Sequence, residues 1–130
     1  MVDAASMSFG QIEAIREVSL EVEKGTIFGL VGSDGAGKST LLRMIATMIK
    51  PLSGTITVGG IDVAAQRARV KPLIGYMPQR FGLYGDLTVE ENMDFFLDIF
   101  GIHGKERRLR KEKYLGFSNL LPFLDRLAGN

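Results

Sequence analysis

The segment GSDGAGKST at residues 32–40 constrains this chain more than any other, because it fits the spacing G-x-x-x-x-G-K-[ST]. Gly32, Gly35 and Gly37 allow backbone angles that a side chain would forbid, and they let the chain approach a ligand closely. Successive N–H groups then form a concave anion site that opens into a helix N-terminus. The spacing predicts a phosphate-binding loop. The alternative is a chance match in a chain with 16 glycines.

Two side chains of this segment carry charge chemistry. Lys38 supplies a mobile positive charge for the β- and γ-phosphates of a nucleotide. The hydroxyl of Ser39 can coordinate Mg²⁺ beside those phosphates. The predicted nucleotide-binding residues of the loop are Gly32, Ser33, Asp34, Gly35, Ala36, Gly37, Lys38, Ser39 and Thr40.

The flanking residues fit the strand and helix that such a loop requires. Residues 26–31 (TIFGLV) are a short apolar run that predicts a buried strand. After Ser39 the apolar residues recur at helical spacing, and Lys50 with Pro51 ends the predicted helix. These apolar residues are Leu41, Leu42, Ile45, Met48 and Ile49.

The rest of the chain predicts an α/β protein in two parts. Residues 1–6 carry no pattern, whereas 18–22, 55–58 and 73–77 predict strands and 64–71 a short helix stopped before Pro72. In the second part, Thr88 with Glu91 forms a capping box for a helix to about Phe100. Gly101 ends that helix, and further helices are predicted at 105–115 and 118–128. The boundary lies between residues 79 and 86.

Composition excludes several classes of site. The chain has 130 residues, 45% of them hydrophobic and 24% charged, as in soluble globular proteins. Its net charge of +1 gives no overall attraction to nucleic acid or to anionic membranes. With no cysteine and one histidine, neither a disulfide framework nor a thiolate metal site is expected. No run is long enough to span a membrane and no signal-peptide pattern occurs, which predicts cytoplasmic residence.

A second block makes the family resemblance specific. YMPQ at 76–79 and LYGDLTVEEN at 83–92 follow the loop, and together they resemble the ATP-binding cassette of ABC transporters, most of all exporter-type cassettes. The resemblance implies a P-loop NTPase fold, an α/β partial cassette with an antiparallel β subdomain, the P-loop strand and helix, and a helical subdomain. Residues 1–130 would be the N-terminal part of one ATP-binding domain, with about 7–79 as the β and P-loop part and about 87–130 as the helical subdomain.

The resemblance also assigns roles to single residues. Phe9 matches the aromatic residue that stacks on adenine, although a core or edge aromatic is the alternative. Gln79 matches the glutamine that reaches Mg²⁺ and the attacking water, although an exposed loop glutamine is the alternative. The resemblance thus implies Lys38 and Gln79 as catalytic residues, Ser39 and Gln79 as metal ligands, and ATP and Mg²⁺ as cofactors. Arg80 to Asp86 would contact the transmembrane subunit.

The sequence departs from the family pattern in two places. Ser33 and Asp34 stand where the family usually has Pro-Asn, which puts the affinity for nucleotide in doubt. The Ser-Gly-Gly signature, the strand ending in Asp-Glu and the switch histidine are absent, and Pro122 with Arg126 disqualifies the apolar run at 121–125. We therefore expect an N-terminal part of a cassette, with an incomplete sheet and with Ile27, Phe28, Leu30 or Val31 unusually exposed.

The resemblance implies an ATP-binding subunit or domain of an ABC transporter. In the complete protein it would hydrolyse Mg-ATP with a second cassette to drive transport, with export as the expected direction. It would be peripheral on the cytoplasmic face of the membrane and would not bind nucleic acid. The alternatives are a non-transport ABC ATPase and a nucleotide-binding fragment without activity. The 130-residue chain alone is expected to be inactive.

Three further groups of polar residues have simple alternatives to a function. Asp94 and Asp98 are spaced for acid–base chemistry on one helix, but a solvated helix face is the expected reading. The basic residues between 105 and 113 allow contact with a membrane or nucleic acid, but a solvated outer face is the expected reading, because the apolar residues Leu109 and Tyr114 are few. His103 is expected to be a surface loop residue.

Overall fold

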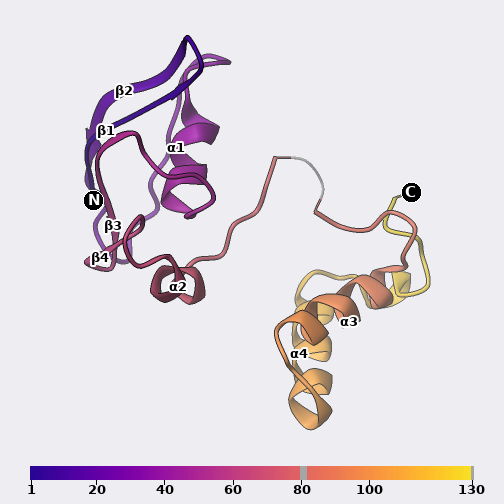
Figure 1. Cartoon of the computed structure of the whole chain (residues 1–130). Helices are drawn as coiled ribbons and strands as arrows, with labels where there is room; N and C mark the ends of the chain where they lie inside the picture. The colour runs from indigo at the N-terminus through magenta and orange to yellow at the C-terminus, as the bar shows by residue number, and fades with distance from the viewer. Residues whose placement is uncertain (80–81, 130) are drawn as a thin grey trace. The chain divides into compact units, whose positions relative to one another are not determined.

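The computed structural model describes residues 1–79 and 82–129 of the chain (Figure 1). The chain divides into two compact units, Met1–Tyr76 and Met77–Asn130. Each unit has its own set of packed elements and is described by itself below. The first is the P-loop unit and the second the helical unit.

The P-loop unit is built on a four-stranded antiparallel sheet in the order β2-β1-β3-β4. Its strands are β1 (Val2–Phe9), β2 (Ile12–Leu20), β3 (Ser53–Val58) and β4 (Ile61–Asp62). The strand predicted at 55–58 is confirmed within β3. The strand predicted at 18–22 is confirmed for residues 18–20, which end β2, whereas residues 21 and 22 lie beyond it. Strand β1 occupies residues where the sequence predicted no element.

Irregular pairing explains why β1 was missed. Ala4 and Glu17 have positive φ angles of 45° and 44°, which interrupts the alternation of a regular strand. Serine hydroxyls accept the displaced amides: Ala4 N–H donates to Ser19 Oγ at 2.9 Å and Glu17 N–H to Ser6 Oγ at 2.9 Å. A pattern of apolar residues at every second position therefore cannot appear along this strand pair.

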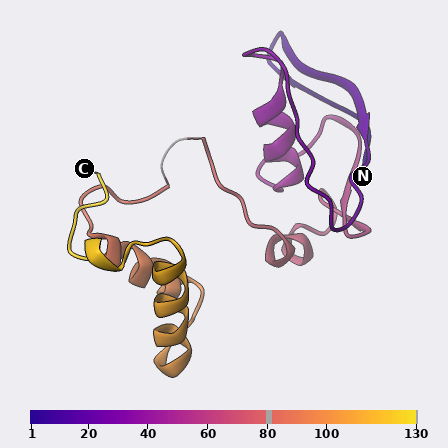
Figure 2. The same cartoon turned by 180° about the vertical axis from the view of Figure 1, so that it is seen from behind.

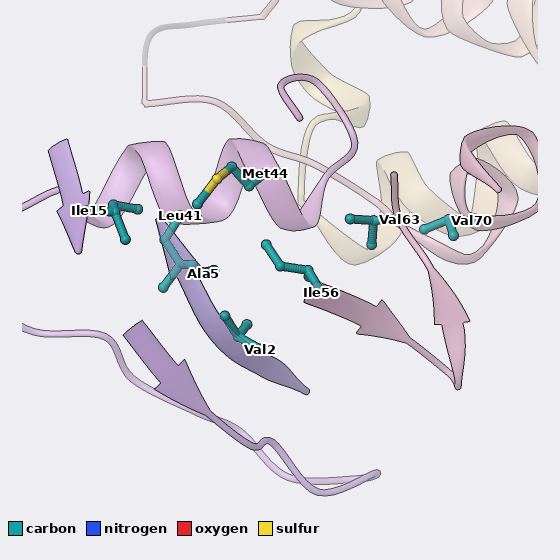
Figure 3. Close-up of a cluster of buried hydrophobic side chains, with 8 residues drawn as sticks. All are labelled: Val2, Ala5, Ile15, Leu41, Met44, Ile56, Val63 and Val70. Carbon is teal, nitrogen blue, oxygen red and sulfur yellow. The ribbon is translucent and has the colours of Figure 1, made fainter. Parts of the chain in front are cut away.

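One helix covers the sheet and forms the core with it. Helix α1 (Lys38–Ile45) lies beside the strands in both views of the chain (Figures 1 and 2). Its buried side chains pack on apolar residues of the strands and of α2 (Arg67–Val70), as Figure 3 shows. The core consists of Val2, Ala5, Ile15, Leu41, Met44, Ile56, Val63 and Val70.

Both helices of this unit are shorter than predicted. Helix α1 ends at Ile45 rather than Ile49, because Thr47 adopts φ of 62° and Met48 N–H donates back to the Arg43 carbonyl at 2.9 Å. The helix predicted at 64–71 is reduced to α2 and the 3-10 helix η1 (Lys71–Leu73). Pro72 lies inside η1, where its missing N–H costs no hydrogen bond.

Two further strand predictions are wrong for this structure. Neither residues 26–31, which precede the loop, nor residues 73–77 form a strand. A strand needs a hydrogen-bonded neighbour. Among the described residues, the one backbone hydrogen bond of residues 26–31 runs from Thr26 N to the Glu23 carbonyl. The expected exposure is confirmed: the exposed fractions are 103%, 52%, 37% and 94% for Ile27, Phe28, Leu30 and Val31.

The helical unit contains α3 (Val89–Ile99), α4 (Gly104–Phe117) and the 3-10 helix η2 (Leu121–Phe123). The predicted capping box is confirmed, with Thr88 and Glu91 each accepting from the other's backbone N–H. Gly101 follows α3 with φ of 66°, as predicted for its end.

The third predicted helix, at 118–128, is wrong apart from η2. Asn119 takes φ of 56° and ends α4, after which the chain turns back to the start of α3. Val89 N–H donates to the Arg126 carbonyl at 2.9 Å and Glu90 N–H to the Leu124 carbonyl at 3.0 Å. The first N–H groups of a helix have no acceptor within the helix. The carbonyls of residues 124 and 126 accept from two such N–H groups of α3.

Candidate functional site

The loop at residues 32–39 joins the extended segment 26–31 to α1. Gly35 and Gly37 have φ angles of 79° and 83°, a region that favours glycine, whereas Gly32 does not. A turn closes the loop, in which Ala36 N–H donates to the Ser33 carbonyl at 3.2 Å. The loop glycines therefore serve different purposes, and the left-handed backbone is needed at two of the three.

Gly37 is fixed by packing as well as by its backbone angle. It is the N-cap residue of α1, and a Cβ at this position would overlap the carbonyl oxygen of Ala14 and crowd Ile15 Cγ1 at 3.1 Å. The loop thus rests directly on β2. Sequence reasoning found Gly37 through its motif but did not anticipate this contact, which only the folded hairpin creates.

The loop and the first turn of α1 present a row of free backbone donors. In the described part of the chain, no backbone or side-chain acceptor is bonded to the N–H groups of Gly35, Gly37, Lys38, Ser39 and Thr40. No side chain caps α1, and its first turn holds no acidic residue. Free N–H groups at a helix N-terminus favour an anion. The arrangement therefore fits a phosphate group.

Lys38 crosses the loop and places its charge beside these donors. Its ammonium donates to the carbonyls of Gly32 at 2.7 Å and Ser33 at 2.6 Å. These two bonds hold the side chain along the loop rather than out in solvent. The positive charge and the free N–H groups consequently face the same short stretch of chain.

The donor set of the loop suits Mg²⁺ only together with phosphate oxygens. Ser39 is exposed, and its hydroxyl makes no hydrogen bond among the described residues. The described residues contain no group of three or more His, Asp or Glu side chains that could hold a metal. Mg²⁺ commonly takes one or two protein ligands and completes its shell with phosphate and water. A single hydroxyl beside a phosphate site fits that habit.

The remaining predicted site residues lie apart from the loop in the chain. Phe9 ends β1 and is 49% exposed, next to the turn into β2, the strand on which the loop rests. Gln79 is exposed and belongs to the helical unit. Of the predicted partner contact Arg80 to Asp86, positions 80 and 81 lie outside the described residues.

Asn92 organises the segment that precedes α3, and sequence reasoning missed it. Its side chain is buried, with 3% exposed. Its Oδ1 accepts from Tyr84 N–H at 2.8 Å, and its Nδ2 donates to the carbonyls of Tyr84, Leu87 and Thr88 at 2.9, 3.2 and 2.9 Å. The position of a lone Asn inside a helix, after a turn-rich segment, is the available sequence signal.

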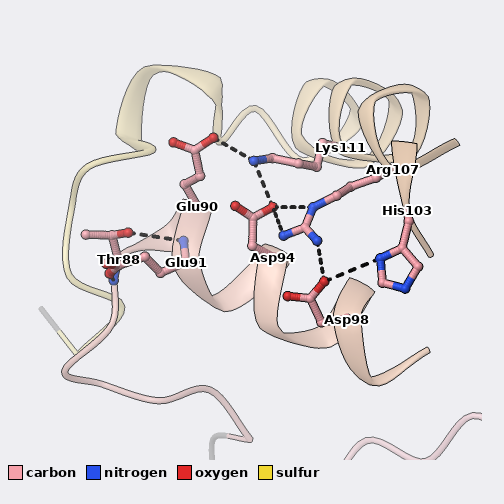
Figure 4. A network of polar contacts seen from close by, with 8 residues as sticks. All are labelled: Thr88, Glu90, Glu91, Asp94, Asp98, His103, Arg107 and Lys111. Atoms are coloured by element: carbon pink, nitrogen blue, oxygen red, sulfur yellow. Dashed lines mark hydrogen bonds and ion pairs between the residues drawn. The ribbon is translucent and has the colours of Figure 1, made fainter. Parts of the chain in front are cut away.

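A network of charges joins α3 to α4 (Figure 4). Arg107 pairs with both Asp94 and Asp98, and Lys111 pairs with Glu90 at 2.6 Å and Asp94 at 2.9 Å. Asp94 and Asp98 are therefore not merely a solvated face, and they make no acid–base pair either. His103 is exposed, as predicted, 3.8 Å from Asp98. Complementary charges at i, i+4 spacing on successive helices were the unused sequence signal.

The network shifts the ionisation of its members. Burial raises the pKa of Asp94, but hydrogen bonds from Lys111 and Arg107 outweigh it and leave that pKa below its ordinary value. Burial lowers the pKa of Lys111, but its bonds to Glu90 and Asp94 raise it overall. In the capping box, the backbone hydrogen bond from Thr88 lowers the pKa of Glu91. All three groups are thus held in their charged forms.

An apolar groove of about 580 Å³ also lies in the helical unit. Its walls include Leu83, Met93, Phe96 and Phe123, with Arg126 as its one charged residue. It offers no row of anion donors comparable to that of the loop. Among the described residues, no helix is long and apolar enough to cross a membrane.

Comparison with known proteins gives the family of this chain. The family model described as "ABC transporter" matches residues 15–129. The chain is 44% identical over 116 residues to "Probable multidrug ABC transporter ATP-binding protein YbhF" of Escherichia coli strain K12, covering 89% of the chain and 20% of YbhF. It is 39% identical over 119 residues to "ABC transporter ATP-binding protein NatA" of Bacillus subtilis strain 168, covering 91% of the chain and 48% of NatA. Methionine import ATP-binding proteins match as well.

A solved structure shares the fold. It is described as a dimeric post-hydrolysis state of an ATP-binding cassette bound to ADP and Pi. The TM-score is 0.78 at 25% identity, over 98% of this chain and 60% of that one. The chain thus spans less than half of the two curated relatives and 60% of that structure. With its P-loop NTPase fold, the chain belongs to the ABC transporter family of ATP-binding domains.

Proposed function

We propose that this chain binds the triphosphate of Mg-ATP on residues 32–40, as part of an ATP-binding subunit that hydrolyses ATP to drive transport. The carrying observation is the set of free N–H groups of Gly35 and of Gly37 to Thr40, beside the Lys38 ammonium. Such a set binds anions without needing an acidic or metal partner on the protein.

Each loop residue then has a defined part. The N–H groups of Gly35 and of Gly37 to Thr40 donate to phosphate oxygens, and Lys38 exchanges its carbonyl partners for the β- and γ-phosphates. The Ser39 hydroxyl, and Gln79 from the helical unit, would hold Mg²⁺, which when bound neutralises charge on the phosphates. Phe9 would stack on the adenine ring. Gln79 would also orient the attacking water.

The partners follow from the family and are likewise proposals. Residues from Arg80 to Asp86 would contact a transmembrane subunit on the cytoplasmic face, and a second cassette would complete the nucleotide site. The dimeric neighbour bound to ADP and Pi supports a paired arrangement. Export is the proposed direction, on the strength of the similarity to YbhF, although relatives named for import also match.

Calorimetric titration of the purified chain with Mg-ATP tests the proposal. Lys38→Ala should weaken binding at least about 100-fold, because hydrogen bonds to a charged group are worth about 1.5–3 kcal/mol each. Lys24→Ala removes an exposed lysine of the same unit and is the matched control. Equal affinity in wild type and Lys38→Ala would refute the phosphate-binding assignment.

The same titration tests the contact with adenine. Phe9→Ala should weaken ATP more than inorganic triphosphate, because only ATP offers a ring to stack on. An identical loss for both ligands would mean that Phe9 only packs the hairpin.

The chain alone should show no steady ATP hydrolysis in an assay of phosphate release. Hydrolysis by the wild-type chain that is lost in Lys38→Ala would contradict an inactive N-terminal part.

A further inference from the structure

Helix α4 has an inner and an outer side with different chemistry. The inner side carries Arg107, Lys111 and Leu115, with exposed side-chain fractions of 26% and 19% for the two bases and a buried leucine. Both bases are paired with carboxylates of α3 (Figure 4). The contacts with α3 therefore use only this side of α4.

The outer side is a stripe of alternating basic and apolar residues. Lys105, Leu109, Lys113 and Phe117 follow one another at i, i+4 spacing, which places them along one side of a helix. We call these four residues the outer stripe. Leu109 is 53% exposed and Phe117 is 90% exposed. In a helix of 14 residues, the stripe extends over about 20 Å.

The charges of the outer stripe are free, unlike those of the inner side. Within the described residues, no carboxylate forms an ion pair with Lys105, Lys113 or the neighbouring Arg108. Glu106 is paired with Arg110 at 2.8 Å, so Glu112 is the other acid on this helix. The Lys113 ammonium lies 5.7 Å from the ring centre of Tyr114. The outer side therefore presents an excess of positive charge around exposed apolar side chains.

An anionic membrane surface complements both the charged and the apolar side chains of the outer stripe. Long basic side chains can lie along an apolar surface while their charge reaches an anionic headgroup. Leucine and phenylalanine between them enter the boundary between headgroups and acyl chains. A soluble polyanion would match the lysines but leave Leu109 and Phe117 in water. We propose that the outer stripe of α4 binds the surface of an anionic lipid membrane.

Flotation with lipid vesicles in the absence of nucleotide tests this proposal, using vesicles of phosphatidylcholine alone or mixed with phosphatidylglycerol. The chain should float with the mixed vesicles and not with phosphatidylcholine alone, and less so at high salt. Each cation near an anionic surface contributes about fivefold. Lys105→Glu/Lys113→Glu should therefore lower the partition coefficient at least about 25-fold.

Two controls make the result specific. Lys24→Glu/Lys71→Glu changes the net charge equally at exposed positions of the other unit and should change partition less than about threefold. Ile27→Ser/Val31→Ser removes the two most exposed apolar side chains of segment 26–31, which tests whether that segment inserts instead, and it should leave binding intact. Phe117→Ser should lower vesicle binding about tenfold without changing retention on heparin.

Four outcomes would overturn the proposal. One is that wild type fails to bind the mixed vesicles. The second is that both double lysine variants lose the same amount, and the third is that Ile27→Ser/Val31→Ser abolishes binding. The fourth is that Phe117→Ser binds as wild type does, which would make the stripe a general polyanion contact. Circular dichroism of each variant verifies that α4 is still folded.

Discussion

The two units differ in how far each one satisfies its own backbone. In the helical unit, the first turn of α3 is bonded by a capping box and by the carbonyls of residues 124 and 126, and Asn92 holds the segment before it. In the P-loop unit, the sheet and α1 share a core, yet residues 26–31 make one backbone hydrogen bond among the described residues and expose four large apolar side chains. The segments of the helical unit are bonded to one another, whereas the P-loop unit keeps one segment without a hydrogen-bonded strand beside it.

Sequence distance accounts for this difference. The backbone hydrogen bonds of the helical unit join residues at most 44 positions apart, the pair Gly85 and Gly129 being the most distant (129 − 85 = 44). A strand has no such local support, because its hydrogen bonds come from a neighbouring strand that can lie anywhere in the chain. A helix therefore makes its hydrogen bonds within its own segment. Residues 26–31 would need a neighbouring strand, and the described residues contain none paired with them.

The largest expected effect is at the point where the P-loop unit is most tightly closed. Gly37→Ala should destabilise that unit by about 3–5 kcal/mol, because it combines a left-handed backbone with overlap against the Ala14 carbonyl. Gly35→Ala is the matched control: its φ is 79° but no atom lies within 4 Å of the added Cβ. It should cost only about 1–2 kcal/mol.

Hydrogen exchange read by mass spectrometry during urea unfolding reports on each unit separately. Loss of protection in α1 and β2 is expected for Gly37→Ala, with the helical unit unchanged. Equal losses for the two glycine variants would show that the loop does not rest on β2 as described.

The next effect breaks the closure of the helical unit. Asn92→Ala should cost about 2–3 kcal/mol, because it leaves the partly buried Tyr84 N–H without a partner and removes one of the two hydrogen bonds that each of three carbonyls accepts. Glu112→Ala, an exposed substitution on α4, should stay within about 0.5 kcal/mol. In the same exchange experiment, a loss confined to residues 84–99 supports Asn92 as the organiser, and none at all argues against it.

A smaller effect depends on pH. Asp94 and Glu91 have pKa values below their ordinary 3.8 and 4.5, so their contribution to stability is present above those ordinary values. It is lost as pH falls through the lowered values. The helical unit should therefore weaken below about pH 4. Asp94→Asn should cost about 1 kcal/mol at neutral pH and flatten that decline. An unchanged pH profile in Asp94→Asn would contradict the role of the network.

The smallest effect on stability is expected where the chain looks most like a core. Ile27→Ser/Val31→Ser should change the free energy of unfolding by less than about 0.5 kcal/mol, since both side chains are almost fully exposed. The same variant should reduce self-association of the chain, measured by analytical ultracentrifugation, because exposed apolar segments favour association. A large loss of stability would mean that residues 26–31 are buried in solution.

The elements that the sequence predicted correctly are those with local signals. Thr88 with Glu91 and Gly101 marked the ends of α3, and the loop glycines marked the start of α1. Bulges at Ala4 and Glu17 hid β1, because they depend on how two strands pair. The turn at Asn119 and the return of residues 124–128 to α3 removed the helix expected there, and neither has a periodic signal.

The candidate site divides in the same way. The spacing of Gly37, Lys38 and Ser39 placed them at the start of one helix, and the structure has them there. The role of Gln79 stays a prediction, because it depends on how residues far apart in the sequence assemble. The contact between Gly37 and Ala14, and the pairing of Asp94 with Lys111, arise only from tertiary packing. No pattern along a single segment can contain them.

The position of the Lys38 ammonium sets a threshold for what the loop can bind. Its two bonds, to the carbonyls of Gly32 and Ser33, must be exchanged when an anion takes the charge. A monoanion presents few charged oxygens, so it gains less from this exchange than a polyphosphate does. A polyphosphate presents several charged oxygens to the ammonium and to the row of N–H groups at once. The carbonyls of the loop therefore compete with the anion for the Lys38 ammonium, and this competition favours polyphosphates over smaller anions before any base or sugar is recognised.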